Sequence, residues 1–320
     1  MKAVRLFAAF VLALLPALAF AQGYPTRPIT LIVPYPPGGA TDVVARVIAE
    51  KLGTSLAQPV IVENKSGAGG NLGARAAAQA KPDGYTLLVA AVTAHSISMT
   101  LAADVAGYDV EKDFEPVTMI GAVPLILVVN PSVPAKTLKE FIALAQSKPG
   151  SITVASAGNG TTQHLGAELF KLMTHTQMLH VPYKGSGPAV TDVIGGQVQA
   201  TFETGPAALA QVKAGRLRAI ATATKERMLP DVPTAAEAGL PGFEVAATYG
   251  VLAPAGTPTA IVARLNSEIG KILQMPDVRT KFEEQGVIPT YTTPEQTARH
   301  IHEEVVKWAK VIKAANVKAD

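Results

Sequence analysis

Residues 29–52 read ITLIVPYPPGGATDVVARVIAEKL, a sequence that contains a strand, a loop and a helix in succession. The run Ile29–Val33 is short and continuously apolar, which is typical of a buried strand in a parallel sheet. A glycine-rich loop over 34–40 follows, and from about Asp42 to Leu52 apolar residues recur on one broad helical face. A strand that leads through a short loop into a helix is the repeating unit of an α/β fold.

The same unit recurs along the chain. Further strands are expected at 60–62, 85–89, 124–130, 152–155, 198–202, 217–221 and 248–253, and further helices at about 71–79, 137–147 and 162–173. In the C-terminal segment, apolar residues stand three or four positions apart, at Ala298, Ile301, Val305, Trp308 and Ile312. This spacing predicts an amphipathic helix with Trp308 in the core.

The length of the chain points to two lobes. It has 320 residues, 48% of them hydrophobic, which is more than one compact core usually organises. The apolar runs at 124–130 and 248–253 are expected to be strands that leave and re-enter the first lobe. We therefore predict a first lobe formed by 22–125 and 248–320, with a second lobe, 126–247, inserted into it.

The N-terminus has the pattern of an export signal. Lys2 and Arg5 precede an uncharged apolar run over 6–20, and Ala19-Phe20-Ala21 is a small-x-small cleavage site. We predict a cleaved signal peptide over 1–21 and a periplasmic mature protein; an uncleaved N-terminal anchor is the alternative. The sequence contains no cysteine, which excludes disulfides, a lipid-anchored cysteine and thiolate metal sites.

The charge of the mature chain argues against nucleic acid as a partner. The signal holds two of the 28 basic residues and none of the 25 acidic ones, so the mature chain carries 26 minus 25, or +1. No block of Lys and Arg provides the electrostatic footprint that nucleic-acid binding requires.

Two loops are candidates for binding a carboxylate, because each joins the end of a strand to the start of a helix. Ligands bind at that edge of an open parallel sheet, where the unpaired N–H groups of the first helical turn attract anions. The first loop supplies Tyr35, Gly38, Gly39, Ala40, Thr41 and Asp42, and the second supplies Ser156, Ala157, Asn159, Gly160, Thr161 and Thr162. The structural alternative is an ordinary turn in each case, with Thr41 or Asp42 capping the first helix.

Two further segments are weaker candidates. Thr93, Ala94 and His95 are expected in a loop after a strand, where a lone histidine is more often structural than functional. Lys184, in HVPYKGS, could act as a base if it were buried, although most such lysines are solvated.

The motifs of common catalytic sites are missing. The sequence contains neither a G-x-S-x-G elbow nor H-E-x-x-H, and His300 and His302, two apart in a helix, make a poor metal pair. We therefore expect no catalytic residue, no metal and no cofactor. A secreted hydrolase or lyase that uses the same cleft is the alternative, and it would be distinguished by turnover.

Segments spread along the chain resemble the Bug family, the TctC-like periplasmic receptors of tripartite tricarboxylate transporters. They include YPTRPITLIVPYPPGGATDVVAR (24–46), KPDGYTLL (81–88), SAGNGTTQHLGAELF (156–170), HVPYKGSGPAVTD (180–192), LPDVPTAAEAGLPGFE (229–244) and YGVLAPAGTP (249–258). The resemblance implies a type II periplasmic-binding-protein fold, with two lobes, a ligand cleft and a two-strand hinge.

The resemblance also implies a function and a site. The ligand would be a di- or tricarboxylate, an acidic amino acid or an aromatic acid, held by the loops 35–42 and 156–162 and passed to membrane permease subunits by a monomeric receptor. Tyr249 matches an aromatic position near the cleft. Relatives often read Phe-Asp-Asn where this chain has Phe202-Glu203-Thr204, a region near the far end of the ligand, so Glu203 leaves the cargo open. A sensor that presents its closed form to a signalling partner is a further alternative.

Overall fold

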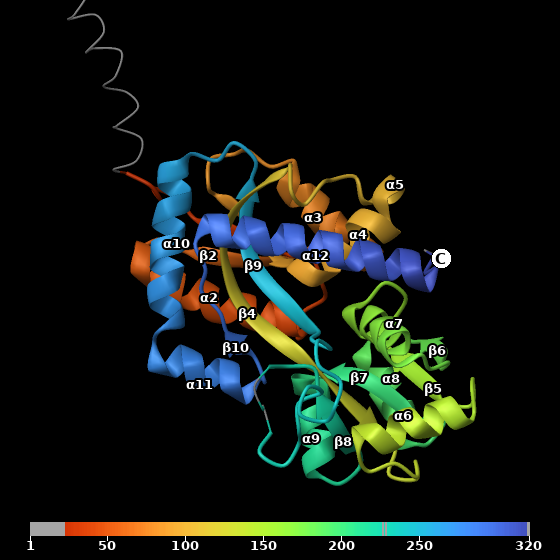
Figure 1. Cartoon of the computed structure of the whole chain (residues 1–320). Helices are drawn as coiled ribbons and strands as arrows, with labels where there is room; N and C mark the ends of the chain where they lie inside the picture. Colours follow the sequence, from red (N-terminus) through yellow and green to blue (C-terminus); the bar gives the residue numbers. More distant parts are fainter. Residues whose placement is uncertain (1–22, 226, 228, 319–320) are drawn as a thin grey trace, which may run out of the picture.

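The computed structural model describes residues 23–225, 227 and 229–318, which form a mixed α/β protein with two lobes (Figure 1). The predicted signal peptide over 1–21 and its cleavage site lie outside the described residues. Within those ranges, no helix combines the length and the apolar character that crossing a bilayer requires.

Two long strands, β4 (Phe114–Val129) and β9 (Ala246–Pro254), run between the lobes. The first lobe contains β1 (Ile29–Val33), β2 (Val60–Asn64), β3 (Thr86–Ala91), β10 (Ile288–Pro289), α2 (Ala40–Leu56), η1 (Ala68–Gly70), α3 (Asn71–Ala78), α4 (Val92–Leu101), α5 (Ala103–Ala106), α10 (Thr259–Leu273), α11 (Pro276–Glu284) and α12 (Pro294–Ala315). The second contains β5 (Thr153–Ser156), β6 (Leu179–Pro182), β7 (Ala200–Thr204), β8 (Arg218–Thr222), α6 (Leu138–Ser147), α7 (Thr162–Thr174), α8 (Ser186–Ile194) and α9 (Gly205–Lys213).

The strands form one continuous sheet in the order β2-β1-β3-β9-β4-β7-β5-β6, with β8 and β10 also paired to β4. Strand β1 is parallel to β2 and β3, and β5 is parallel to β6 and β7. Strand β4 is antiparallel to all its partners and changes them along its length: Pro124 is opposite Ala246 of β9, whereas Leu125 is opposite Thr204 of β7. Strands β4 and β9 therefore form the connection on which the lobes can hinge.

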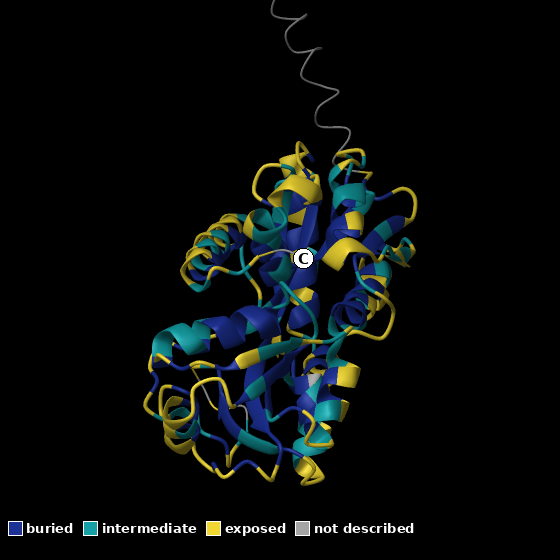
Figure 2. Ribbon diagram, turned by 90° about the vertical axis from the view of Figure 1, so that its right-hand side faces the viewer, coloured by how far each residue is buried: buried dark blue, intermediate teal, exposed yellow. Residues whose placement is uncertain are grey.

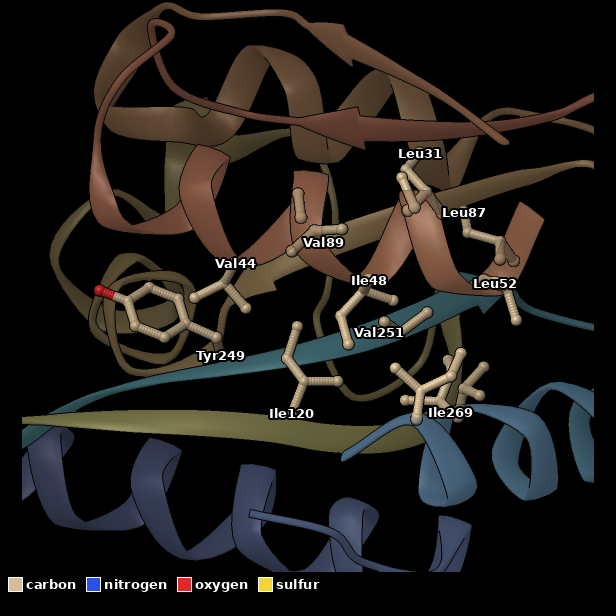
Figure 3. Close-up of a cluster of buried hydrophobic side chains, with 14 of the residues drawn as sticks. Leu31, Val44, Ile48, Leu52, Leu87, Val89, Ile120, Tyr249, Val251 and Ile269 are labelled. Atoms are coloured by element: carbon tan, nitrogen blue, oxygen red, sulfur yellow. The ribbon is translucent and has the colours of Figure 1, made fainter. Parts of the chain in front are cut away.

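Each lobe has its own hydrophobic core, visible as the buried segments in Figure 2. In the first lobe, Leu31, Ile48 and Val251 pack between the sheet and helices α2 and α10, as Figure 3 shows. In the second lobe, Phe170 and Phe202 lie with their ring centroids 5.2 Å apart. These cores fix the ends of the strands that face the space between the lobes.

Helix α12 contributes to the cores of both lobes. Ile301 belongs to a first-lobe cluster, whereas Trp308, which is fully buried as predicted, packs with second-lobe residues. Figure 1 shows α12 crossing the first lobe and ending beside α7. The lobe boundaries given above remain a prediction. They assign the whole of α12 to the first lobe and so do not account for its packing with second-lobe residues.

Two sequence-based expectations about local structure are wrong. Strand β4 begins at Phe114 rather than near 124, because Pro116 and Pro124, which disfavour a central strand, obscure its pattern. The segment with Thr93 and Ala94 is not a loop: it forms the first turn of α4, which begins directly after β3.

Candidate functional site

A cavity of about 660 Å³ lies between the lobes and is lined from both sides. The first lobe and the hinge contribute Tyr35, Ala40, Thr41, Ala68, Gly69, Asn71, Thr93, Ala94, Ile97, Leu101, Thr248 and Tyr249. The second lobe contributes Ala157, Asn159, Gly160, Thr161, Thr162, Gln163, Gly185, Ser186 and Thr204. Among the described residues, none that lines this cavity is charged.

Helix N-termini converge on this cavity. Its lining includes Thr41 in the first turn of α2, Thr93 in the first turn of α4, Gln163 in the first turn of α7 and Ser186 at the start of α8. The first N–H groups of a helix have no intrahelical acceptor and carry partial positive charge. The site therefore combines neutral side chains with a favourable field for an anion.

The second-lobe loop is held in place by hydrogen bonds around the start of α7. Thr161 is the N-cap: its hydroxyl accepts the amide of His164 at 3.3 Å and donates to the Gly158 carbonyl at 2.7 Å. The Gly160 amide donates to His164 Nδ1 at 3.1 Å, and the φ of +73° at Gly160 favours glycine. These bonds place Gly160 and Thr161 on the cavity wall.

The first-lobe loop is held by Asp42, whose side chain is not part of the cavity lining. Its carboxylate accepts hydrogen bonds from the Gly38 amide, from Arg46 and from Asn64, each at 2.9 Å. Burial raises the pKa of this carboxyl, but the three donors outweigh burial and hold the pKa below its ordinary value. The N-cap of α2 is Gly39, so the expectation that Thr41 or Asp42 would cap this helix is wrong.

Thr93 and Thr248 on the cavity wall and Glu304 outside the lining join the elements α4, β9 and α12. The Thr93 hydroxyl lies 2.8 Å from Glu304 Oε2 and 2.9 Å from the Thr248 hydroxyl. The Ala246 carbonyl, 3.0 Å from the Thr93 hydroxyl, is a second acceptor for its proton. Trp308 Nε1 also donates to Glu304 Oε2, at 2.9 Å. Sequence reasoning missed Glu304, since an acid on a helix is normally read as solvated.

Glu203 is fully buried at the end of β7, beside the second-lobe wall of the cavity but not part of its lining. Its Oε1 accepts from Gln163 Nε2 at 3.1 Å and from Ser186 Oγ at 3.0 Å. Burial raises the pKa of this carboxyl, against the opposing effect of its hydrogen bonds to Thr204, Gln163 and Ser186.

A serine and a histidine do meet in the second lobe. Ser156 Oγ lies 2.6 Å from His180 Nε2, and the His180 ring stacks on His164 with centroids 3.8 Å apart. Ser156 is fully buried and does not line the cavity. The pair serves to hold the loop.

Most of the predicted binding residues lie on the cavity wall. Those that line it are Tyr35, Ala40, Thr41, Thr93, Ala94, Ala157, Asn159, Gly160, Thr161, Thr162 and Tyr249. Those that do not are Gly38, Gly39, Asp42, Ser156 and Glu203. The weaker candidates His95 and Lys184 are also outside the lining. In the described part of the chain, no three His, Asp or Glu side chains are grouped to hold a metal ion.

Comparisons with known proteins identify relatives over most of the chain. The profile of the family TctC, described as "Tripartite tricarboxylate transporter family receptor", matches residues 44–317. BugT of Bordetella pertussis (strain Tohama I) is 43% identical over 301 residues, which cover 93% of this chain and 92% of BugT.

Solved structures give the same result. Rpa4515 of R. palustris, solved with adipate, is 38% identical with a TM-score of 0.83, over 92% of this chain and 99% of that one. MatC (Rpa3494) from Rhodopseudomonas palustris, with bound malate, is 37% identical with a TM-score of 0.77, over 90% and 100%. The predicted fold and family are therefore confirmed, and this chain belongs to the TctC family of periplasmic solute-binding receptors, with two lobes, a ligand cleft and a two-strand hinge.

Proposed function

We propose that this receptor binds a small organic acid in the cavity between its lobes and releases it unchanged. The observation that carries the proposal is a cavity without charged side chains on which the N-termini of four helices, α2, α4, α7 and α8, converge. Such a site stabilises a carboxylate through neutral dipoles rather than ion pairs. The relatives solved with adipate and with malate support the same class of ligand.

The proposed delivery route rests on the family and the N-terminus. The signal pattern over 1–21 supports export and cleavage, and the family description supports handover to membrane permease subunits; that the receptor is a monomer is a further part of the proposal. N-terminal sequencing of the periplasmic protein tests the cleavage after Ala21. Size-exclusion chromatography with light scattering tests the monomer.

A charge-matched pair of variants tests acid binding directly. Ala40 lines the cavity at the first position of α2, where either Asp or Asn is compatible with a helix start. The two side chains have the same size, so only Ala40→Asp adds a negative charge to the wall. We expect Ala40→Asp to bind a panel of mono- and dicarboxylic acids at least about tenfold more weakly than Ala40→Asn, measured by calorimetry.

Two outcomes would contradict the proposal. One is equal affinity of the two Ala40 variants for every acid that binds the parent protein. The other is conversion of a bound acid, detected by NMR after prolonged incubation, which would favour the hydrolase or lyase alternative. A bound acid at about 100 times its Kd should also raise the free energy of unfolding by about 2.7 kcal/mol.

A further inference from the structure

Glu203 is surrounded by hydrogen-bond donors that all reach one of its two oxygens. Oε1 accepts from Gln163 Nε2 at 3.1 Å, Ser186 Oγ at 3.0 Å, the Thr204 amide at 2.8 Å and the Thr204 hydroxyl at 3.1 Å. Oε2 is buried and has no hydrogen-bond partner. The carboxyl is therefore anchored from the cavity side only.

The same three residues form part of the cavity wall. Gln163 lies in the first turn of α7, Ser186 begins α8 and Thr204 is the N-cap of α9. Their donor groups point at Glu203, a residue of the chain, instead of at a ligand. Gln163 Nε2 also donates to Ser186 Oγ at 3.2 Å, so both of its contacts lie within this cluster.

The side-chain groups that Gln163, Ser186 and Thr204 leave for a ligand are acceptors, in contrast to the backbone N–H groups at the starts of α7 and α8. The hydroxyls of Ser186 and Thr204 each have one proton, and Glu203 takes it. The side-chain amide of Gln163 donates to Glu203 through its NH₂ group, so its carbonyl oxygen is the atom that remains for a ligand. Lone pairs of Gln163, Ser186 and Thr204 favour a hydroxyl, an ammonium or an amide N–H, and oppose a carboxylate.

We propose that Glu203 takes the place of a second ligand carboxylate, so that the receptor selects acids with one carboxylate and a hydrogen-bond donor at the end that meets Gln163, Ser186 and Thr204. The inference rests on the proposed function, because it requires that the ligand is an acid. Glu203 is then a positioning residue: it does not touch the ligand, and it sets specificity through Gln163, Ser186 and Thr204.

Ligand pairs of equal length test this in the unmodified mature protein. Adipate is compared with 6-hydroxyhexanoate and 6-aminohexanoate, and succinate with 4-hydroxybutanoate and 4-aminobutanoate, by calorimetry. In each set, we expect the hydroxy acid or the amino acid, whichever binds better, to bind at least about tenfold more tightly than the dicarboxylate of the same chain length. Equal or tighter binding of the dicarboxylates would overturn the inference, and this arm needs no variant.

Two substitutions separate the hydrogen-bonding role from mere packing. Glu203→Met keeps the volume but accepts no hydrogen bond, so it releases the three donors to the cavity. We expect the preference for donor-terminated acids to fall at least about tenfold, through stronger binding of dicarboxylates. Glu203→Gln retains an amide oxygen that can accept from the same donors, and it should restore most of the preference. An unchanged preference in Glu203→Met would contradict the proposal.

Glu168→Gln is the matched control. Glu168 is a buried acid on α7 that pairs with Lys171 at 2.7 Å and does not line the cavity. Its substitution should leave the ratio of affinities unchanged. If neither member of any pair binds, the proposed function fails; if both bind without preference, only the role of Glu203 fails.

Discussion

His95 is a neutral, fully buried imidazole behind the first-lobe wall of the cavity. Its Nδ1 lies 2.9 Å from the Tyr108 hydroxyl, whereas its Nε2 has no hydrogen-bond partner. Burial lowers the pKa of His95 from 6.5 to about 4, because the surroundings offer nothing to stabilise the imidazolium. A lone histidine at this position is thus structural, and its effect should be visible as a dependence of stability on pH.

We predict that the free energy of unfolding falls as the pH is lowered from about 6.5 to about 4. In this interval the unfolded chain binds a proton at His95 that the folded chain does not, so acid favours unfolding. The full effect is about 3 kcal/mol, from a pKa difference of about 2.5 units. Urea unfolding at a series of pH values would measure it.

His95→Gln should flatten this dependence, whereas His175→Asn, at an exposed position whose φ of +52° Asn tolerates, should leave it unchanged. Glu203 acts in the opposite direction: its raised pKa makes the folded state lose stability as the pH rises past the ordinary glutamate value. The contribution of His95 is therefore the difference in the pH dependence of the free energy of unfolding between the parent protein and His95→Gln. An identical pH dependence in the two would show that His95 does not control it.

At the scale of the element, Thr161 affects both the stability of helix α7 and the binding site, since it caps the helix and lines the cavity. We expect Thr161→Ala to lower the free energy of unfolding by about 1 kcal/mol and also to weaken acid binding. Thr137 caps α6 with a capping box and is not part of the cavity lining. Thr137→Ala should cost similar stability and leave the acid Kd unchanged; a parallel loss of affinity in both would mean that global stability, not the cap, affects binding.

Helix α12 depends on one buried acid. Glu304 Oε2 accepts from Thr93 at 2.8 Å and from Trp308 at 2.9 Å, which ties the helix to α4 and orients its aromatic residue. In Glu304→Leu the Thr93 hydroxyl can still donate to the Ala246 carbonyl at 3.0 Å, but the buried Trp308 indole N–H loses its acceptor, so we expect a loss of about 1–3 kcal/mol in urea unfolding. The neighbouring exposed residue gives the control: Glu303→Leu should stay within about 0.5 kcal/mol. Equal effects would contradict the role of Glu304.

Sequence patterns predicted those elements whose local signals agree. The run Ile29–Val33 is continuously apolar and the segment with Trp308 has a clear helical periodicity, and both have the predicted structure. Strand β4 was underpredicted, because two prolines and Gly121 interrupt a segment that tertiary pairing with β9 makes continuous. The burial of Glu203 and Glu304 was not predicted, because each acid accepts in part from donors far away in sequence, Gln163 and Ser186 for Glu203 and Thr93 for Glu304, and no local pattern records those donors.

At the scale of the molecule, the two-lobed fold with its two-strand hinge was predicted from two apolar runs far apart in sequence together with the family resemblance. The close approach of the lobes was not. Gly160 of the second lobe and Leu101 of the first line the same cavity, and a β-carbon at Gly160 would lie 2.8 Å from Leu101 Cδ2. The two sides of the cleft are thus in contact, as expected for a receptor that closes over its ligand by hinge motion.

The absence of cysteine makes this closure directly measurable, since two introduced cysteines can be spin-labelled without interference. Asp104 on α5 and Lys184 before α8 are exposed and lie on opposite lobes. Because both lobes line the cavity, an acid bound there should favour the closed arrangement, so we expect the distance distribution of the Asp104→Cys/Lys184→Cys pair to shorten and narrow when a binding acid is added. The pair Lys81→Cys/Asp104→Cys lies within one lobe and should keep its distribution. If the acid binds by calorimetry but the distances between the lobes stay as they were, the lobes do not move on β4 and β9, and the cleft is a preformed site.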